Sequence, residues 1–233
     1  MVVVTLAAGR LRVRAHDGVS EVQVRTVQAK FAHDSRAVAA ASSSSVVSSG
    51  DEVVVTVGDP DGRGRAPQVL VDVDVPTGAR LRVEAGEAEV VCTGSLGELT
   101  ARTSSGSVNA ELVTGRTDIR TGRGPVSVHS CQGSTRVSSA DGTVIIREVS
   151  GRLEVSGRSG DVHVWWLAGP AAISTSTGNV TVGWGRGRLV RLDLDTTGGR
   201  VQTGLTSDPE AAEAVVVRTI SGDVRVEPAD GLR

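Results

Sequence analysis

Apolar and polar residues alternate along most of the chain in short segments, and these segments recur at a fixed spacing. A variable residue and then an apolar-x-apolar segment follow many glycines, as in Gly142-Thr-Val144 and Gly160-Asp-Val162. Alternation of this kind predicts strands that bury one face. The glycines form two interleaved series with steps of 18 residues, which are Gly97, Gly115, Gly133, Gly151, Gly169, Gly187 and Gly106, Gly124, Gly142, Gly160, Gly178.

A fixed period of this size is typical of a solenoid, and each half-repeat of nine residues is too short for a helix plus a strand. The predicted fold class is therefore all-β, a parallel β-solenoid (β-helix) with 18-residue coils over residues 79–227. Equivalent residues of successive coils should stack about 4.8 Å apart. The expected core columns are Val108, Val126, Val144, Val162, Val180 and Val113, Cys131, Val149, Leu167.

The two flanks depart from the period. Residues 1–78 contain short alternating segments, and an Ala- and Ser-rich segment at 32–48 predicts a short helix, so this region is expected to be a β-rich cap. Near the other end, Asp208-Pro-Glu210 predicts a loop before the last pair of strands. Pro228 should block further pairing at that edge, and residues 228–233 should form a tail. The solenoid ends are the expected place for a homo-oligomer to form.

Composition narrows the choice of partners. The 233 residues carry 25 basic and 27 acidic side chains, for a net charge of −2. This balance argues against nucleic acid or an anionic membrane as a partner. No apolar run approaches the ~20 residues of a membrane span. The N-terminus does not resemble a signal peptide, which predicts a cytoplasmic protein. Cys92 and Cys131 fit no metal spacing and are expected to be free thiols, and no cofactor is predicted.

Few residues suggest chemistry. Gly183-Trp-Gly-Arg-Gly187 lacks the lysine of a phosphate-binding loop and is expected to be an insertion between coils. Asp193 and Asp195 should share an outer face beside Arg191, where paired carboxylates could do acid–base work, although an exposed, ion-paired strand face is the commoner arrangement. The histidines, which are His16, His33, His129 and His163, do not suggest a metal site.

The tryptophans are the most unusual surface candidates, because aromatic residues make up only 2% of the chain. In repeat register, Trp166 and Trp184 are expected at the same position of adjacent coils, with Trp165 facing outward beside His163. One interpretation is that they cover a corner of the solenoid or pack beneath the loop at 183–187. The other is an exposed aromatic binding patch made of Trp165, Trp166, Trp184, His163 and Arg147.

Three segments carry a motif of the type T-x-S-G-D-V-x-V, which are Arg102-Thr-Ser-Ser-Gly-Ser-Val108, Val155-Ser-Gly-Arg-Ser-Gly-Asp-Val162 and Val217-Arg-Thr-Ile-Ser-Gly-Asp-Val-Arg-Val226. With Val71-Asp-Val-Asp-Val-Pro-Thr-Gly78 before them, they resemble the bacterial putative-adhesin family of unknown function, a β-strand repeat family, over residues 69–227. The composition resembles that of actinobacterial members. The resemblance implies a β-solenoid without known catalytic residues.

Two functions are consistent with these observations. The first is a non-catalytic β-solenoid scaffold or interaction module, adhesin-like, that binds a protein or an extended ligand on its outer face. The alternative is an enzyme or small-molecule-binding protein with a surface groove around Trp165, Trp166 and His163 and the pair Asp193 and Asp195. A concave pocket that brings His163 to a carboxylate would favour the alternative.

Overall fold

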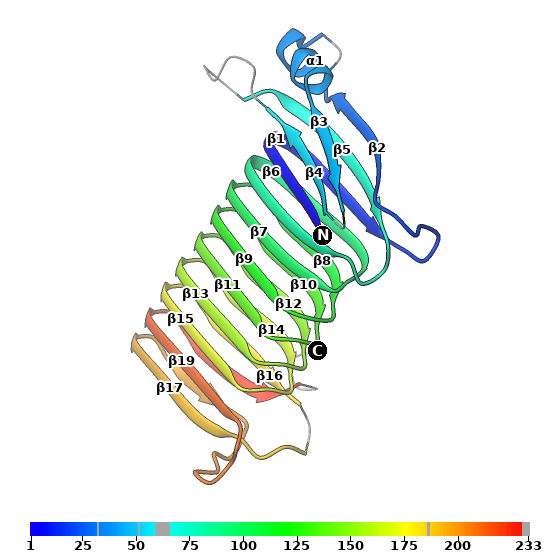
Figure 1. Cartoon of the computed structure of the whole chain (residues 1–233). Coiled ribbons are helices and arrows are strands. Elements are labelled where there is room, and N and C mark those ends of the chain that lie inside the picture. The colour runs from blue at the N-terminus through cyan, green and yellow to red at the C-terminus, as the bar shows by residue number, and fades with distance from the viewer. Residues whose placement is uncertain (32, 51, 59–65, 186, 230–233) are drawn as a thin grey trace.

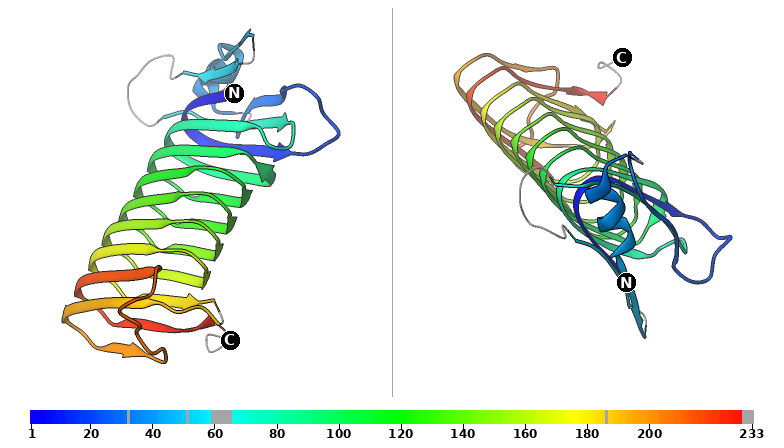
Figure 2. Two further views of the ribbon diagram at one scale, coloured as in Figure 1. Left: turned by 60° about the horizontal axis from the view of Figure 1, so that its bottom comes forward. Right: turned by 90° about the horizontal axis from the view of Figure 1, so that it is seen from above.

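The chain folds as a parallel β-solenoid, as the 18-residue period predicts (Figure 1). The structure is a computed structural model that describes residues 1–31, 33–50, 52–58, 66–185 and 187–229, without the side chain of Thr26. Each regular coil contributes one strand to each of two rows, and the coils stack along one axis (Figure 2).

We call the two rows the first sheet and the second sheet. In spatial order, the first sheet contains β7 (Glu98–Ser105), β9 (Thr117–Arg123), β11 (Thr135–Asp141), β13 (Leu153–Ser159), β15 (Ala171–Thr177), β19 (Ala214–Ser221) and β17 (Arg191–Gly198). The second sheet contains β8 (Val108–Val113), β10 (Val126–Cys131), β12 (Val144–Val149), β14 (Val162–Leu167), β16 (Val180–Trp184), β20 (Val224–Pro228) and β18 (Val201–Thr203).

The core consists of the predicted columns. Val126 pairs with Val108 on one side and Val144 on the other, and all three are buried. Cys131 lies in the second column between Val113 and Val149 and is fully buried. Cys92 is buried as well, so both predicted free thiols belong to the interior. Valine suits these positions because a branched side chain packs well on a pleated surface.

Glycine recurs where the regular coils turn from the first sheet to the second, whereas the coil of β6 has Ala88 at the equivalent position. Gly124 has a φ of +112°, which L side chains rarely adopt. A Cβ atom added there would lie 2.2 Å from the carbonyl oxygen of Gly106 in the neighbouring coil. Stacked coils therefore approach one another too closely at Gly124 for any side chain, which explains why glycine recurs at this corner with the period of the coil.

The solenoid begins before residue 79, where the sequence period starts. β1 (Val2–Ala15) is itself a whole coil, and it lies between the coil of β4 (Glu52–Val57) and β5 (Gln68–Val75) and the coil formed by β6 (Arg80–Leu96). Beyond β4 and β5, the end is covered by antiparallel strands β2 (Gln23–Ala29) and β3 (Ser45–Ser49), with α1 (Ser35–Ser42) nearby (Figure 1). The helix confirms the one expected within 32–48.

A buried carboxylate ties this end together. Asp74 of β5 accepts hydrogen bonds from Arg14 of β1, at 2.7 Å, and from Arg25 of β2. Burial alone would raise the pKa of Asp74, but the hydrogen bonds and charges of the two arginines outweigh it and lower the pKa. The ionised carboxylate thus joins three strands that are far apart in the sequence.

The opposite end differs from the sequence prediction. β19 and β20 do not form the edge, because they lie between the coil of β15 and β16 and the coil of β17 and β18. The segment after β16 skips a whole coil, and the gap is filled later by β19 and β20. The edge belongs to β17 and β18, so Pro228 does not terminate the stack.

The segment around Asp208 does form the expected loop, and it covers the start of β17. The Leu192 N–H donates to Ser207 Oγ at 3.0 Å, and the Asp208 N–H donates to the Val190 carbonyl at 2.9 Å. Of the predicted tail, residues 230–233 lie outside the described residues.

Candidate functional site

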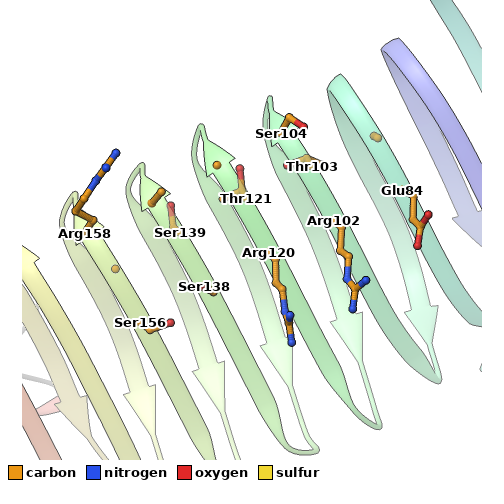
Figure 3. A pocket seen from close by; sticks show the side chains of 14 residues that line it. Glu84, Arg102, Thr103, Ser104, Arg120, Thr121, Ser138, Ser139, Ser156 and Arg158 are labelled. Atoms are coloured by element: carbon orange, nitrogen blue, oxygen red, sulfur yellow. The ribbon is translucent and has the colours of Figure 1, made fainter. Parts of the chain in front are cut away.

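A shallow trough crosses the outer surface of the first sheet and the adjoining part of β6. It runs over β6, β7, β9, β11 and β13 and has a volume of about 770 Å³ (Figure 3). The residues that line it are Glu84, Ala85, Arg102, Thr103, Ser104, Arg120, Thr121, Gly122, Ser138, Ser139, Ala140, Ser156, Gly157 and Arg158. Since each strand contributes two or three of them, the trough runs along the stack and not along any one strand.

Small side chains at repeated positions make this part of the surface hollow. Ser138 and Ser156 are register partners on β11 and β13, and Ala140 lies two residues after Ser138. Side chains that alternate along a strand point to the same face, so these three residues lie on the outer face together. A run of short side chains on that face leaves room for a ligand.

Two arginines lie side by side in the trough. Arg102 of β7 and Arg120 of β9 are register partners, so they are about one strand spacing, 4.8 Å, apart along the stack. Figure 3 shows both side chains extending in the same direction, with Glu84 beside them. Arg120 Nε donates to Asp118 Oδ1 at 3.3 Å, and the same carboxylate lies 3.5 Å from Arg116. Like charges at adjacent positions repel each other, and here a single carboxylate is shared between Arg120 and a third arginine.

The other charged residues of the trough already have partners. Glu84 accepts a hydrogen bond from Arg82 Nη2 at 2.6 Å, and this bond and the Arg82 charge lower its pKa, with a smaller effect of Arg102. Arg158 Nη2 lies 2.7 Å from Asp141 Oδ2. The pKa of Asp141 is lowered by a hydrogen bond from Ser159 and then by the bond from Arg158. The charge available to a ligand is therefore concentrated at Arg102 and Arg120.

Beneath the trough, hydroxyl side chains form a buried column. Thr121 Oγ1 donates to the Arg123 carbonyl at 3.0 Å, and Thr175 Oγ1 donates to the Thr177 carbonyl at 3.3 Å. Among the described residues, the buried Thr103 hydroxyl has no such partner. The column therefore anchors the turns after β9 and β15, but it does not do so after β7.

The tryptophan patch is only partly assembled. Trp165 is 47% exposed and Trp166 is half-buried, but Trp184 is 1% exposed and cannot belong to a surface patch. The expected equivalence of Trp166 and Trp184 is wrong, because a bulge after Val164 shifts the register and pairs Trp184 with Leu167. Trp184 thus occupies a core position.

Trp184 has a structural role that fits the first interpretation of the tryptophans. Its Nε1–H donates to the Arg188 carbonyl at 2.9 Å. Arg188 lies in the segment that skips a coil between β16 and β17, so Trp184 packs at the corner and holds this segment. The insertion expected at 183–187 is correct only in its second half, because Gly183 and Trp184 belong to β16 and pair with β20; residue 186 lies outside the described residues.

The remaining members of the patch lie on the second sheet. His163 and Trp165 belong to β14, and Arg147 belongs to the neighbouring β12. Arg147 also lines a smaller hollow of about 310 Å³ together with Glu111 and His129. Trp165, Trp166, His163 and Arg147 thus form a second candidate contact surface, separate from the trough.

The residues of the enzyme alternative do not converge. Asp193 and Asp195 lie on β17 of the first sheet, whereas His163 lies on β14 of the second sheet. Asp193 is hydrogen-bonded by Arg218 of β19, which lowers the pKa of Asp193, and not by the neighbouring Arg191. Both carboxylates are exposed on the strand face, and Asp193 is the one that is ion-paired among the described residues.

Within the described ranges, no group of three or more His, Cys, Asp or Glu residues is arranged to hold a metal ion. No helix in the part of the chain that the structure describes is long and apolar enough to cross a membrane.

The trough was not predicted from the sequence, although a signal for it existed. Arg102, Arg120, Ser138, Ser156 and Ser174 stand 18 residues apart and therefore form one outward column. Comparing outward positions across coils, as was done for the core, would have identified two adjacent arginines followed by serines.

No family model matches the chain, and no curated protein matches it. Among solved structures, the chain is similar to the crystal structure of a putative cell adhesion protein from Clostridium sporogenes. The alignment covers 97% of this chain and 92% of that chain, with 8% sequence identity and a TM-score of 0.26. At this level of similarity, function has to be argued from the residues of this chain.

Proposed function

We propose that this chain is an adhesin-like interaction module that binds an extended ligand in the trough of the first sheet. The observation that carries the proposal is the trough itself, which crosses five strands and offers hydroxyl groups and two adjacent arginines along its length. A regular solenoid face presents such groups at a constant spacing of about 4.8 Å, which suits a long ligand better than a compact one.

The trough is also rigid, which favours binding. β7, β9, β11 and β13 are each hydrogen-bonded to a strand on both sides. The backbone positions from which the outward side chains project are therefore fixed before a ligand arrives, so binding orders side chains and not the backbone. The resemblance of the sequence to the putative-adhesin family supports the same class of function.

A capture experiment tests this proposal. Immobilised wild-type protein is exposed to a native extract of the source cells, including the envelope fraction, and bound proteins and glycans are identified by mass spectrometry. The variant Ser138→Trp fills the middle of the trough. Ala172→Trp adds the same side chain at an exposed position of β15 outside the trough and serves as the matched control.

The proposal expects a ligand that the wild-type protein and Ala172→Trp retain and Ser138→Trp loses, with unchanged circular dichroism in all three. A ligand that Ser138→Trp retains in full would overturn it. Trp165→Ser distinguishes the second candidate surface: a ligand lost only in that variant would transfer the function to the second sheet, where the exposed Trp165 lies near Arg147.

A further inference from the structure

The positive charge of the trough is concentrated at one place and is only partly balanced there, because the one carboxylate beside it, that of Glu84 on β6, is already hydrogen-bonded by Arg82 at 2.6 Å. Arg102 and Arg120 are exposed register partners on adjacent strands. Within the part of the chain that the structure describes, Arg102 forms no ion pair, and Arg120 shares Asp118 with Arg116. Placing two like charges side by side costs stability. An anion between the two guanidinium groups would remove this cost.

The spacing suits one anionic group. A guanidinium group is planar and presents several N–H donors that match the two oxygens of a carboxylate. Two such groups about one strand spacing apart, extending in the same direction as Figure 3 shows, can both donate to a carboxylate placed between them. Both side chains are exposed, so a ligand reaches them without a change in the fold.

Beyond this pair, the trough is rich in hydroxyl groups, and its last charged residue, Arg158, is paired with Asp141. Ser138 and Ser156 continue the arginine column on the next two strands, and Ser104 lies on β7 two residues after Arg102. A ligand that follows the trough therefore meets two adjacent arginines at one point and mainly hydrogen-bonding hydroxyls at the others. This pattern fits a polymer that carries carboxylates and also many hydroxyl groups.

Two other classes of linear polymer fit less well. A peptide that binds to a sheet in extended form pairs with a free strand edge, but every strand under the trough from β7 to β13 has both edges paired. A single-stranded nucleic acid binds through a positive groove and aromatic stacking. The residues that line the trough include no aromatic side chain, and the chain has a net charge of −2.

We infer that the ligand of the trough is an acidic polysaccharide, and that Arg102 and Arg120 together bind the carboxylate of one uronic acid unit while Ser138 and Ser156 hydrogen-bond to the sugar hydroxyls. This inference rests on the proposed function and adds the class of ligand and the residues that select it.

Binding of oligogalacturonate, measured by isothermal titration calorimetry, tests the inference. Methyl-esterified oligogalacturonate is the matched ligand control, since esterification removes the carboxylate charge and leaves the chain and its hydroxyl groups. Arg102→Gln and Arg120→Gln test the subsite. Arg136→Gln is the matched protein control, because Arg136 lies on the same sheet outside the trough and is paired with Glu154 at 2.7 Å.

We expect the wild-type protein and Arg136→Gln to bind oligogalacturonate equally, and each trough variant to bind about tenfold or more weakly, the usual loss for one hydrogen bond to a charged group. The methyl ester should bind at least as weakly, and added salt should weaken binding of the free acid. Equal binding of acid and ester, or full binding by Arg102→Gln, would overturn the inference. So would tighter binding of a poly-glutamate peptide or of oligothymidylate than of oligogalacturonate.

The capture experiment separates this inference from the proposed function. If oligogalacturonate does not bind but a captured ligand is still lost in Ser138→Trp, the trough is a binding site and the assigned ligand class is wrong. If nothing depends on Ser138 and oligogalacturonate does not bind, both are wrong.

Discussion

Alanine substitutions at three glycines should separate two effects of an added methyl group, the backbone strain of a positive φ and the steric clash with the neighbouring coil. Gly160 has a φ of +124°, and a Cβ atom there would lie 2.3 Å from the Gly142 carbonyl oxygen. Gly78 also has a positive φ, +77°, but a Cβ atom there would meet nothing within 4 Å. Gly157 lies in β13 without a positive φ, and its nearest contact would be Thr175 Oγ1 at 3.5 Å, an ordinary distance.

The three alanine variants should therefore differ in order and in size. Gly78→Ala incurs only the backbone strain and should lose about 1 kcal/mol of unfolding free energy. Gly160→Ala incurs strain of about 1–3 kcal/mol and overpacking of about 1–3 kcal/mol, so we expect a loss of about 4 kcal/mol. Gly157→Ala should gain about 0.5 kcal/mol, because alanine loses less backbone entropy than glycine on folding.

Urea unfolding followed by circular dichroism measures these differences, provided that the slope of free energy against urea concentration is the same in all variants. Equal losses for Gly160→Ala and Gly78→Ala would refute the reasoning, because they would show that neighbouring coils can separate at the corner without cost. A destabilised Gly157→Ala would show that the space beside Thr175 is smaller than the structure indicates.

Three further predictions concern buried groups. Asp74→Asn should destabilise the protein by about 1–2 kcal/mol at pH 7, because a neutral amide loses the charge-assisted hydrogen bonds from Arg14 and Arg25, whose half-exposed side chains remain solvated. Since the folded-state pKa of Asp74 is lowered, the wild-type advantage is present above the ordinary aspartate pKa and disappears as the pH falls through the lowered value; urea unfolding at pH 7 and pH 3 checks this. Trp184→Phe should cost about 1–2 kcal/mol through a lost hydrogen bond and a small cavity, whereas Trp165→Ser should change stability by about 0.5 kcal/mol or less, both measured by urea unfolding. Burial raises the pKa of Cys92 to about 12 and also raises that of Cys131, so neither thiol of the native protein should react with a thiol reagent at pH 8, and fast labelling without denaturant would contradict this burial.

The central coils could be predicted from the sequence because one period controls both their register and their core. A step of 18 residues brings Val108, Val126 and Val144 into one column, and a shift of one residue would turn every valine to the solvent. The same step predicts Cys131 in the core, where it is fully buried.

The ends could not be predicted in the same way, because the order of strands in space is not their order in the sequence. The segment Gly9-Arg-Leu11-Arg-Val13 does follow the glycine and apolar-x-apolar pattern, and Gly9 has a φ of +130° like the later corner glycines. It is not recognisable as a coil because only one coil at that end carries the pattern, and its register partners lie at least 51 residues later in the chain, as Val53 does from Val2. Likewise, nothing local in the sequence shows that β19 pairs with β15.

The candidate site, like the fold, could be predicted only in part from the sequence. The trough depends on an outward column of Arg102, Arg120 and Ser138 whose spacing is visible in the sequence, but its hollow shape depends on neighbouring side chains. Trp184 was assigned to the surface because the expected register ignored the bulge after Val164. A bulge of one residue moves a side chain from the outer face to the core, and the regular period conceals it.

β1, β19 and β20 each lie one coil inward from an end of the stack, and this position determines where the molecule opens locally. Each of these segments is hydrogen-bonded on both edges, so it detaches only when two ladders break. Among the described residues, the strands with a single partner are β2, β3, β17 and β18, which all lie within the sequence. Fraying therefore starts at internal segments and not at the first or last strand, so amide hydrogen exchange should be fast in β17 and slow in β1. Enzymes that remove residues one by one from a chain end should stop at these clamped segments, whereas an endoprotease would find its first sites around β17 and β18.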